Sequence, residues 1–453
     1  MAEQVDVVVI GMGPGGEHVA GRLAEAGLSV VGVEAELVGG ECPYWGCVPS
    51  KMMIRAGNLL AEARRVPGMA GTARVSADWA PVADRVRDEA TDDWNDQVAA
   101  DRFTGKGGRL VRGHGRLAGP GRVEAGGEVF EARRGIVLAT GSRPQIPPVP
   151  GLDAVPYWTN RDAIAAKEPP GTLLVLGGGA VGLELAQVYA RFGTHVTVVE
   201  ALDRLLPAEE PEAGELLTGV LRGEGLTVRT GARVGRVRHS GDAFTLTLED
   251  GAELTGDQLL VATGRRADLS ALGLDTVGLD PAARALRTDG QMLAAPALWG
   301  VGDVTGHGAF THLAMYQAEI VIRAVLGEPG PDADYRALPR VTFTDPEVGA
   351  VGLTEKQARE KGLRVRTGVA RVPSSARGWI HKAGNEGLVK LVEDADRGVL
   401  VGATAAGPMG GEVMYGLAVA VQATVPVEAL RHMIYAYPTF HRGVEDALRE
   451  LRG

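Results

Sequence analysis

Cys42 and Cys47 stand close together near the start of the chain and are its only cysteines. Four residues separate the two thiols, so a disulfide between them requires the backbone to curl at the start of a helix. A helix N-terminus and the nearby Lys51 both favour thiolate over thiol. In a chain with so few cysteines, this pair indicates redox or catalytic chemistry. The alternative is a pair of buried cysteines that behave as small hydrophobic residues.

A glycine-rich turn precedes the cysteine pair and is typical of an electron carrier's binding site. A β-branched run predicts a buried strand before Gly11, and a helix is predicted over His18–Ala26. Gly11 permits a tight turn, Gly13 lets the backbone approach a pyrophosphate, and Gly16 allows close helix–strand packing. The helix N-terminus attracts phosphate. The next strand-like run ends at Glu34, which can accept hydrogen bonds from ribose hydroxyls.

The same arrangement occurs a second time. A run of Leu and Val leads into Gly177, Gly179 and Gly182, then a helical segment, and a second strand-like run ends at Glu200. Eighteen positions separate the last glycine from the acid in both copies. One glycine motif is weak support, but two with a matched strand, helix and acid predict two bound dinucleotides.

Composition excludes several other classes of protein. Hydrophobic residues make up 45% and charged residues 23%, as in an ordinary globular protein, which excludes a mainly disordered chain. The net charge of −10 argues against a nucleic-acid binder. The longest apolar run, Val413–Val425, is too short for a membrane span and predicts a buried helix. The first residues lack the basic region of a secretory signal, so we expect a cytoplasmic protein. No cluster has metal-ligand spacing, and we expect no metal.

Together these features resemble the class I pyridine nucleotide-disulfide oxidoreductases, the family of dihydrolipoyl dehydrogenase, glutathione reductase and mercuric reductase. The resemblance covers essentially the whole chain. Besides the two glycine turns, it is carried by the cysteine pair with Val48–Lys51, and by Ala139–Gly141, Ala262–Gly264, Gly302-Asp303, Phe343–Gly349 and Val351–Glu355. The last two segments look like the start of the family's dimer-interface domain.

The resemblance implies an α/β fold with two Rossmann-like dinucleotide-binding domains and a C-terminal α+β dimerisation domain. Proline-rich segments mark the joints between them. We expect an FAD domain at 1–155, completed by 275–335, an NAD(P) domain at 156–274, and an interface domain at 336–453. In the last, strands are predicted near Val341 and Val389 and helices near Ala358 and Val413. The implied assembly is a homodimer whose subunits share the active site.

The resemblance also implies the cofactor contacts. The residues implied for FAD are Gly11, Gly13, Gly16 and Glu34 at the ADP part, Gly115 at the adenine end, Asp303 at the ribityl chain, and Thr140, Gly141 and Thr311 near the flavin or pyrophosphate. Lys51 would lie near flavin N5 and pair with Glu184. Those implied for the nicotinamide cofactor are Gly177, Gly179, Gly182, Glu200 and Gly264. An acid at 200 would repel a 2′-phosphate, which favours NADH over NADPH; the alternative is a solvated strand end.

By the family's mechanism, NADH reduces FAD, and FAD opens a Cys42–Cys47 disulfide. Cys47 would be the thiolate next to the flavin, and Cys42 the interchange thiol that meets a small disulfide, or a dithiol in reverse. The flavin supplies the redox chemistry, and the protein supplies position and electrostatics.

The pattern breaks at the C-terminus, where Tyr437 and Arg442 stand at the positions of the family's His and Glu dyad. Tyrosine is a poor base at neutral pH. If a helix begins at Phe440, His441 and Glu445 lie one turn apart and would replace the dyad; the alternative is an ordinary interface histidine.

These departures leave other functions open. Tyr437 favours a reductase of quinones, dyes or oxygen in which the thiols are not essential. A flavin-bound interaction subunit without turnover is the third hypothesis.

The residues around the cysteines also depart from the family pattern. Glu41 stands in place of the Thr that usually precedes the first cysteine. Tyr44 and Trp45 form either an aromatic wall for a planar acceptor or part of the core. The absence of a C-terminal cysteine pair disfavours mercuric ion as the acceptor.

Overall fold

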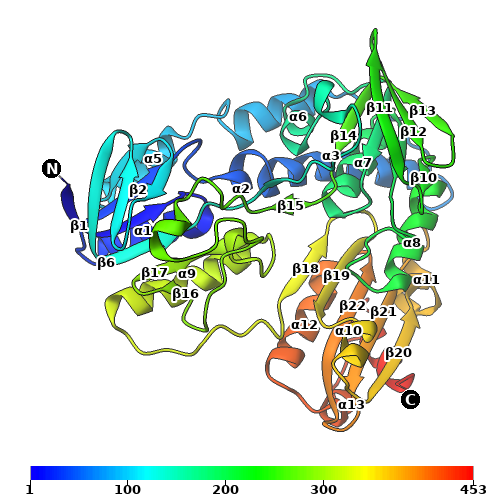
Figure 1. The fold of residues 1–453 in the computed structure, drawn as a ribbon. Helices are drawn as coiled ribbons and strands as arrows, with labels where there is room; N and C mark the ends of the chain where they lie inside the picture. Colours follow the sequence, from blue (N-terminus) through cyan, green and yellow to red (C-terminus); the bar gives the residue numbers. More distant parts are fainter. Residues whose placement is uncertain (1, 452–453) are drawn as a thin grey trace. The chain divides into compact units, whose positions relative to one another are not determined.

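The computed structural model describes residues 2–451, which fold into two compact units of strands and helices (Figure 1). Unit 1 comprises the residues up to Ser50, Asp84–Gln145 and Gly264–Asp334; unit 2 comprises Lys51–Ala83, Ile146–Thr263 and the residues from Tyr335 on. The predicted α/β fold class is confirmed. The three domain ranges expected from the sequence stay a prediction.

Unit 1 is built on a sheet of eight strands. Its strand β1 (Glu3–Ile10) lies between β6 (Glu128–Leu138) and β2 (Val30–Glu34) and pairs parallel with both. Val7 and Val8 are fully buried in two different apolar clusters, which explains why β1 reads as one continuous apolar run. The other strands are β3 (Arg109–Arg112), β4 (Gly115–Leu117), β5 (Arg122–Ala125), β16 (Leu293–Ala295) and β17 (Leu298–Gly300).

Helices flank this sheet and carry the segments of interest. Helix α1 (Pro14–Glu25) packs against α9 (Thr311–Leu326). Helix α1 begins four residues earlier than predicted, because proline is favoured in the first turn of a helix. The cysteines lie on α2 (Glu41–Tyr44) and α3 (Cys47–Arg65), and α3 continues into unit 2. Three short helical segments follow α3: α4 (Ala80–Asp84), a π-helical turn at Arg85–Ala90, and α5 (Gln97–Gly105).

Unit 2 holds a second parallel sheet and two antiparallel ones. The parallel strands have the order β10-β9-β8-β14, and helix α7 (Ala180–Arg191) follows β8. Their bounds are β8 (Thr172–Leu176), β9 (His195–Val199), β10 (Thr227–Arg229) and β14 (Gln258–Val261), with α6 (Asn160–Ala165) and α8 (Pro211–Gly223). The three-stranded sheet comprises β11 (Val234–Ser240), β12 (Ala243–Leu248) and β13 (Glu253–Gly256).

The C-terminal part of unit 2 is a five-stranded antiparallel sheet in the order β18-β19-β22-β21-β20. Helix α12 packs on β19 and β22, and α14 packs on β20 and β21. This confirms the expected α+β character. The strands are β18 (Pro339–Thr342), β19 (Glu347–Gly352), β20 (Val365–Arg371), β21 (Leu388–Asp394) and β22 (Val399–Gly407). The helices are α10 (Glu355–Glu360), α11 (Ala376–His381), α12 (Gly410–Gln422), α13 (Val427–Arg431) and α14 (Gly443–Arg449).

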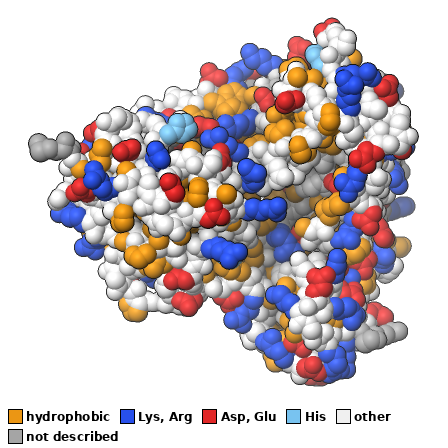
Figure 2. Space-filling view, in the orientation of Figure 1, with side chains coloured by type: hydrophobic (Ala, Val, Ile, Leu, Met, Phe, Trp, Pro, Cys, Tyr) orange, Lys and Arg blue, Asp and Glu red, His pale blue; other side chains and the backbone are white. Residues whose placement is uncertain are grey.

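The surface charge and the helix lengths bear on nucleic-acid binding and on membrane insertion. On the face drawn in Figure 2, Lys and Arg side chains are interspersed with Asp and Glu rather than gathered by sign. Among the helices of residues 2–451, none combines the length and apolar composition that crossing a bilayer requires.

Candidate active site

The first glycine turn joins β1 to α1 and is tightly packed at Gly11 and Gly16. Gly11 has a φ of +93°, and a Cβ there would lie 2.5 Å from the Ala139 oxygen. A Cβ on Gly16 would lie 1.9 Å from the Gly11 oxygen. A Cβ on Gly13, by contrast, meets no heavy atom of the described chain within 4 Å. Gly13 therefore borders the open space that a pyrophosphate at this helix start requires.

Glu34 is tied to this turn. Its Oε2 accepts the Met12 N–H at 2.7 Å, and its Oε1 accepts the Glu36 N–H at 2.8 Å. Burial raises the pKa of Glu34, although these backbone hydrogen bonds oppose the rise. No side chain within residues 2–451 caps the first turn of α1, so its amides face the open side of the turn. The turn, helix start and acid thus fit a dinucleotide.

The second glycine turn, between β8 and α7, repeats this geometry. Gly177 has a φ of +114°, and a Cβ on Gly182 would lie 2.5 Å from the Gly177 oxygen. A Cβ on Gly179 again meets no described atom within 4 Å. Glu200 is 9% exposed; its Oε2 accepts the Gly178 N–H at 2.6 Å, and its Oε1 accepts the Leu202 N–H at 2.7 Å. The spacing predicted the two acids but not that each would bind its own turn.

The two cysteines lie at the starts of two successive helices. Cys42 is half-buried in the first turn of α2, and Cys47 is the exposed first residue of α3. The Sγ of Cys47 lies 3.5 Å from Oγ1 of Thr311, the first residue of α9. The structure therefore brings together two residues that were predicted near the flavin.

The loop between the cysteines is held by aromatic packing. Tyr44 is buried, and Trp45 stacks on Trp94 with ring centroids 5.1 Å apart. The indole Nε1 of Trp94 donates to the backbone carbonyl oxygen of Tyr44 at 3.3 Å. Sequence reasoning missed Trp94, which lies about fifty positions from its partner.

A polar network in unit 1 connects Asp303 with the residue before Cys42. Ser142 Oγ donates to Asp303 Oδ2 at 2.6 Å, and Arg265 Nε donates to Ser142 Oγ at 2.9 Å. Arg265 Nη1 lies 3.5 Å from Glu41 Oε2. Burial raises the pKa of Asp303. These side chains, Glu41 excepted, line a cavity of about 350 Å³. Sequence reasoning assigned no role to Ser142 or Arg265; each directly follows an Ala-Thr-Gly turn, which was the available signal.

The other predicted cofactor residues of unit 1 lie apart from this network or at its border. Thr140 and Gly141 precede Ser142, and Gly141 has a φ of +67°. The carbonyl oxygen of Gly264 accepts the Gln145 N–H at 2.9 Å, and Gly264 lies in unit 1. Its contact with the nicotinamide cofactor stays a prediction. Gly115 lies in β4, where a Cβ would come within 2.8 Å of Ile10.

Lys51 and Glu184 form the expected ion pair in unit 2. Lys51 Nζ donates to Glu184 Oε2 at 2.8 Å and lies 4.6 Å from the centre of the Phe343 ring. The other oxygen of Glu184 accepts the Phe343 N–H at 2.8 Å. The carboxylate, 6% exposed, is therefore fixed from two sides.

The predicted helix at Phe440 is wrong, and with it the expected arrangement of His441 and Glu445. The Gly443 N–H donates to the Phe440 carbonyl oxygen at 2.9 Å, so the chain makes a tight turn there, and α14 begins only at Gly443. The Glu445 carboxylate pairs instead with Arg442 at 3.0 Å and with Arg449.

His441 and Tyr437 have other neighbours. The His441 ring lies edge-on to Tyr435, with centroids 6.0 Å apart, and within residues 2–451 it makes no hydrogen bond to Glu445. Tyr437 is 69% exposed, and its ring centre lies 5.4 Å from the Arg442 guanidinium.

The chain matches two family models. Residues 5–318 match the pyridine nucleotide-disulphide oxidoreductase model, and residues 338–448 match that family's dimerisation domain.

Curated relatives cover nearly the whole chain. A dihydrolipoyl dehydrogenase of Thermus scotoductus is 34% identical over 464 residues, covering 98% of this chain and 97% of the relative. A mercuric reductase of Streptomyces lividans is also 34% identical, covering 96% and 93%.

Solved structures agree. LpdA of Mycobacterium tuberculosis superposes with a TM-score of 0.85 at 27% identity over all of both chains. The HOCl-induced flavoprotein disulfide reductase RclA of Escherichia coli, in its Cu(II) complex, has a TM-score of 0.86 at 26% identity over 99% of each.

Proposed function

Because this chain belongs to the pyridine nucleotide-disulphide oxidoreductases, we propose that it passes electrons from NADH through FAD to Cys42 and Cys47, and on to a small disulfide. The family is one of flavoprotein enzymes that use FAD and NAD(P). The net reaction would convert NADH, a proton and a disulfide into NAD⁺ and two thiols, or run in reverse from a dithiol. Hydride from NADH supplies two electrons and one proton, and solvent supplies the second proton.

FAD would be held by the first glycine turn. Gly13 and the uncapped start of α1 would face its pyrophosphate, Glu34 its ribose and Asp303 its ribityl chain. The open side of the turn and the cavity at Asp303 support this placement. When bound, FAD would carry two electrons between the nicotinamide and the sulfur pair.

The position of Cys47 is the observation that carries the proposal. It is the first residue of a helix of 19 residues and lies beside Thr311, so the helix dipole favours its thiolate form. Cys47 would face the flavin, and Cys42 would exchange with the acceptor. Lys51, held by Glu184, would place its ammonium group near flavin N5.

NADH is the proposed donor. The second glycine turn would hold its pyrophosphate, and Glu200 would accept hydrogen bonds from the ribose hydroxyls. The carboxylate of Glu200 is fixed by two backbone amides, which supports repulsion of a 2′-phosphate at this position.

The matched dimerisation domain indicates a homodimer. In residues 336–453 several large hydrophobic side chains are exposed, Trp379, Tyr415, Ile434 and Tyr437 among them. Such a group marks an interaction surface. We infer that two copies meet there and share the active site.

Anaerobic titration with NADH tests the proposal. We expect a two-electron-reduced enzyme with a long-wavelength thiolate–flavin charge-transfer band, and loss of that band and of disulfide reduction in Cys47→Ser. Retention of disulfide reduction in Cys47→Ser would contradict the proposal. A turnover panel of lipoamide, low-molecular-weight disulfides and quinones identifies the acceptor.

The C-terminal segment favours a second candidate, an NAD(P)H-dependent reductase of quinones or other small acceptors. Tyr437 stands at the position of the proton-exchanging histidine of disulfide-reducing family members. The Glu445 carboxylate forms ion pairs with Arg442 and Arg449. A quinone needs no thiol for its reduction. Quinone turnover that survives in Cys47→Ser, with none on disulfides in the unaltered enzyme, would select this candidate.

A further inference from the structure

Helix α7 carries a line of polar side chains although it is buried on most sides. Glu184, Gln187 and Arg191 are spaced three and four residues apart, so they lie along one face of the helix. Their exposed fractions are 6%, 3% and 3%. Buried polar groups require hydrogen-bond partners, so each of the three must bind a neighbouring segment.

This face binds the segment Phe343–Asp345 at three points. The Gln187 side chain accepts the Asp345 N–H at 2.7 Å and donates to the backbone carbonyl oxygen of Asp345 at 2.8 Å. Arg191 Nη2 donates to Asp345 Oδ2 at 2.8 Å. Glu184 accepts the Phe343 N–H two residues earlier. All three α7 side chains therefore bind the short segment that carries the ring lying against Lys51.

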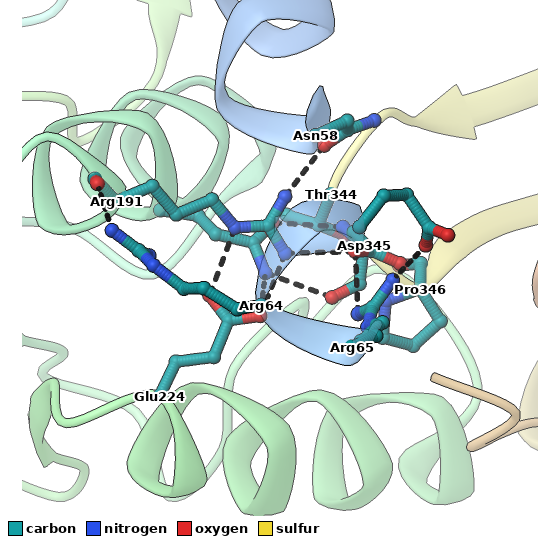
Figure 3. A network of polar contacts seen from close by, with 10 residues as sticks. Asn58, Arg64, Arg65, Arg191, Glu224, Thr344, Asp345 and Pro346 are labelled. Atoms are coloured by element: carbon teal, nitrogen blue, oxygen red, sulfur yellow. Dashed lines mark hydrogen bonds and ion pairs between the residues drawn. The ribbon is translucent and has the colours of Figure 1, made fainter. Parts of the chain in front are cut away.

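The same face binds helix α3 beyond Lys51. Arg191 Nη1 donates to Asn58 Oδ1 at 2.5 Å, and Arg64 donates to the Arg191 oxygen at 2.8 Å (Figure 3). Arg65 donates to Asp345 Oδ2 at 2.8 Å. Lys51, Asn58 and Arg65 recur every seven residues, so they share one face of α3. Helices α3 and α7 are thus joined at the ion pair and again about two turns away.

The charges around Arg191 balance and its geometry is restrictive. Three guanidinium groups and three carboxylates meet here: Arg64, Arg65 and Arg191, with Glu62, Glu224 and Asp345. Arg191 Nε and Nη2 donate to the two oxygens of Glu224 at 3.0 Å and 2.6 Å. A bidentate guanidinium fixes direction as well as distance, which a lysine ammonium does not.

We propose that Arg191 and Gln187 are positioning residues that hold Asp345 and α3 so that the Lys51–Glu184 ion pair keeps one orientation. The proposal rests on the function proposed above for Lys51. Neither residue touches the reacting atoms; both act through Glu184, Phe343 and Lys51.

The test measures the midpoint potential of FAD and the charge-transfer band in the purified FAD-loaded enzyme. Lys51→Met removes the ammonium group, so it gives the largest shift in the potential and the band that this route can produce. We expect Arg191→Gln and Arg191→Lys to shift both quantities in the same direction by a smaller amount. Because Arg191 acts through Lys51, Arg191→Gln should add nothing in a Lys51→Met background.

The matched control is Arg340→Lys. Arg340 also forms a bidentate pair, with both oxygens of Glu209 at 2.9 Å, so the variant loses an equivalent fork. We expect both Arg340→Lys and Arg191→Lys to lower the unfolding temperature. Arg340→Lys should leave the midpoint potential of FAD and the charge-transfer band unchanged.

The outcomes separate the two proposals. A Lys51→Met shift with wild-type values in both Arg191 variants, or additive shifts in the double variant, overturns the positioning role and leaves the proposed function intact. If Lys51→Met itself has no effect, the role proposed for Lys51 fails. Amide exchange at Phe343 then decides: faster exchange in Arg191→Lys than in Arg340→Lys supports positioning by Arg191, and equal exchange overturns it.

Discussion

The two glycine-rich turns of this chain share one backbone design, but the helices that follow them bind different groups. In both turns the last glycine, Gly16 or Gly182, packs against the first one too closely for any side chain. In both, the acid at the end of the next strand, Glu34 or Glu200, accepts the N–H of the turn's second residue. A dinucleotide fits either turn for the same physical reasons.

The difference begins two residues after the last glycine. His18 stands there in α1, partly exposed, with its Nε2 2.5 Å from Glu319 on α9. Glu184 stands there in α7, buried, and binds Lys51 and Phe343. The turn therefore follows from local sequence, whereas the polar face of α7 follows from the segments packed against it. The first helix thus binds a neighbouring helix at this position, and the second binds a lysine.

The glycine packing gives the prediction with the largest effect. A Cβ in Gly16→Ala would lie 1.9 Å from a backbone oxygen, closer than the 2.5 Å in Gly182→Ala. We expect Gly16→Ala to cost about 3 kcal/mol or more and to abolish FAD retention, and Gly182→Ala to retain FAD but weaken NADH binding. Flavin absorbance and thermal unfolding measure both effects.

Gly219→Ala is the control for glycine replacement itself. Gly219 lies within α8, and a Cβ there meets no described atom within 4 Å. We expect a stabilisation of up to about 1 kcal/mol. Equal retention of FAD in Gly16→Ala and Gly219→Ala would contradict the close packing of Gly16 against Gly11.

Exchanging the residues that differ gives the next largest effect. Glu184→His removes the carboxylate that neutralises Lys51 and accepts the Phe343 N–H, so we expect a cost of about 3 kcal/mol and a fall in turnover of about 10²-fold. His18→Glu lies at a partly exposed site and should change stability by about 1 kcal/mol or less, with turnover unchanged. Similar losses in the two variants would mean that the helices are equivalent after all.

Prediction from sequence succeeded where the partners are close along the chain. Each turn, from Gly11 to Glu34 and from Gly177 to Glu200, lies within one strand–helix–strand unit, so spacing alone located it. The Lys51–Glu184 pair joins residues 133 positions apart, and only the family resemblance supplied it.

Other parts of the site depend on packing that no spacing rule contains. The line Glu184, Gln187 and Arg191 on an otherwise apolar helix was the signal for the Asp345 network, but its partners lie up to 159 positions away. At the C-terminus, the regular spacing of His441 and Glu445 misled, because residues 440–442 form tight turns and α14 begins only at Gly443.

Glu200 should govern the choice of nucleotide, and Glu34 should not. Glu200→Gln keeps the side chain's shape and removes the charge that would repel a 2′-phosphate. We expect the ratio of kcat/KM for NADPH to that for NADH to rise about tenfold, which corresponds to about 1.4 kcal/mol. Glu34→Gln should leave the ratio unchanged. A ratio that does not move in Glu200→Gln would contradict the role proposed for Glu200 in repelling a 2′-phosphate.

The smallest expected effect is a pH dependence of FAD retention that originates in Glu34. Burial raises the pKa of this carboxyl, so it gains a proton earlier than an exposed glutamate as the pH falls. The protonated group is a poorer acceptor for the Met12 N–H and for ribose hydroxyls, and FAD affinity should therefore fall as acidity increases through that pKa. For folding without FAD the sign is opposite, because a raised carboxyl pKa stabilises the chain at low pH and this contribution is lost as the pH rises. Ultrafiltration at progressively lower pH should thus release FAD in a step that is absent from Glu34→Gln, which binds more weakly throughout. An identical release curve in the two proteins would exclude Glu34 as its origin.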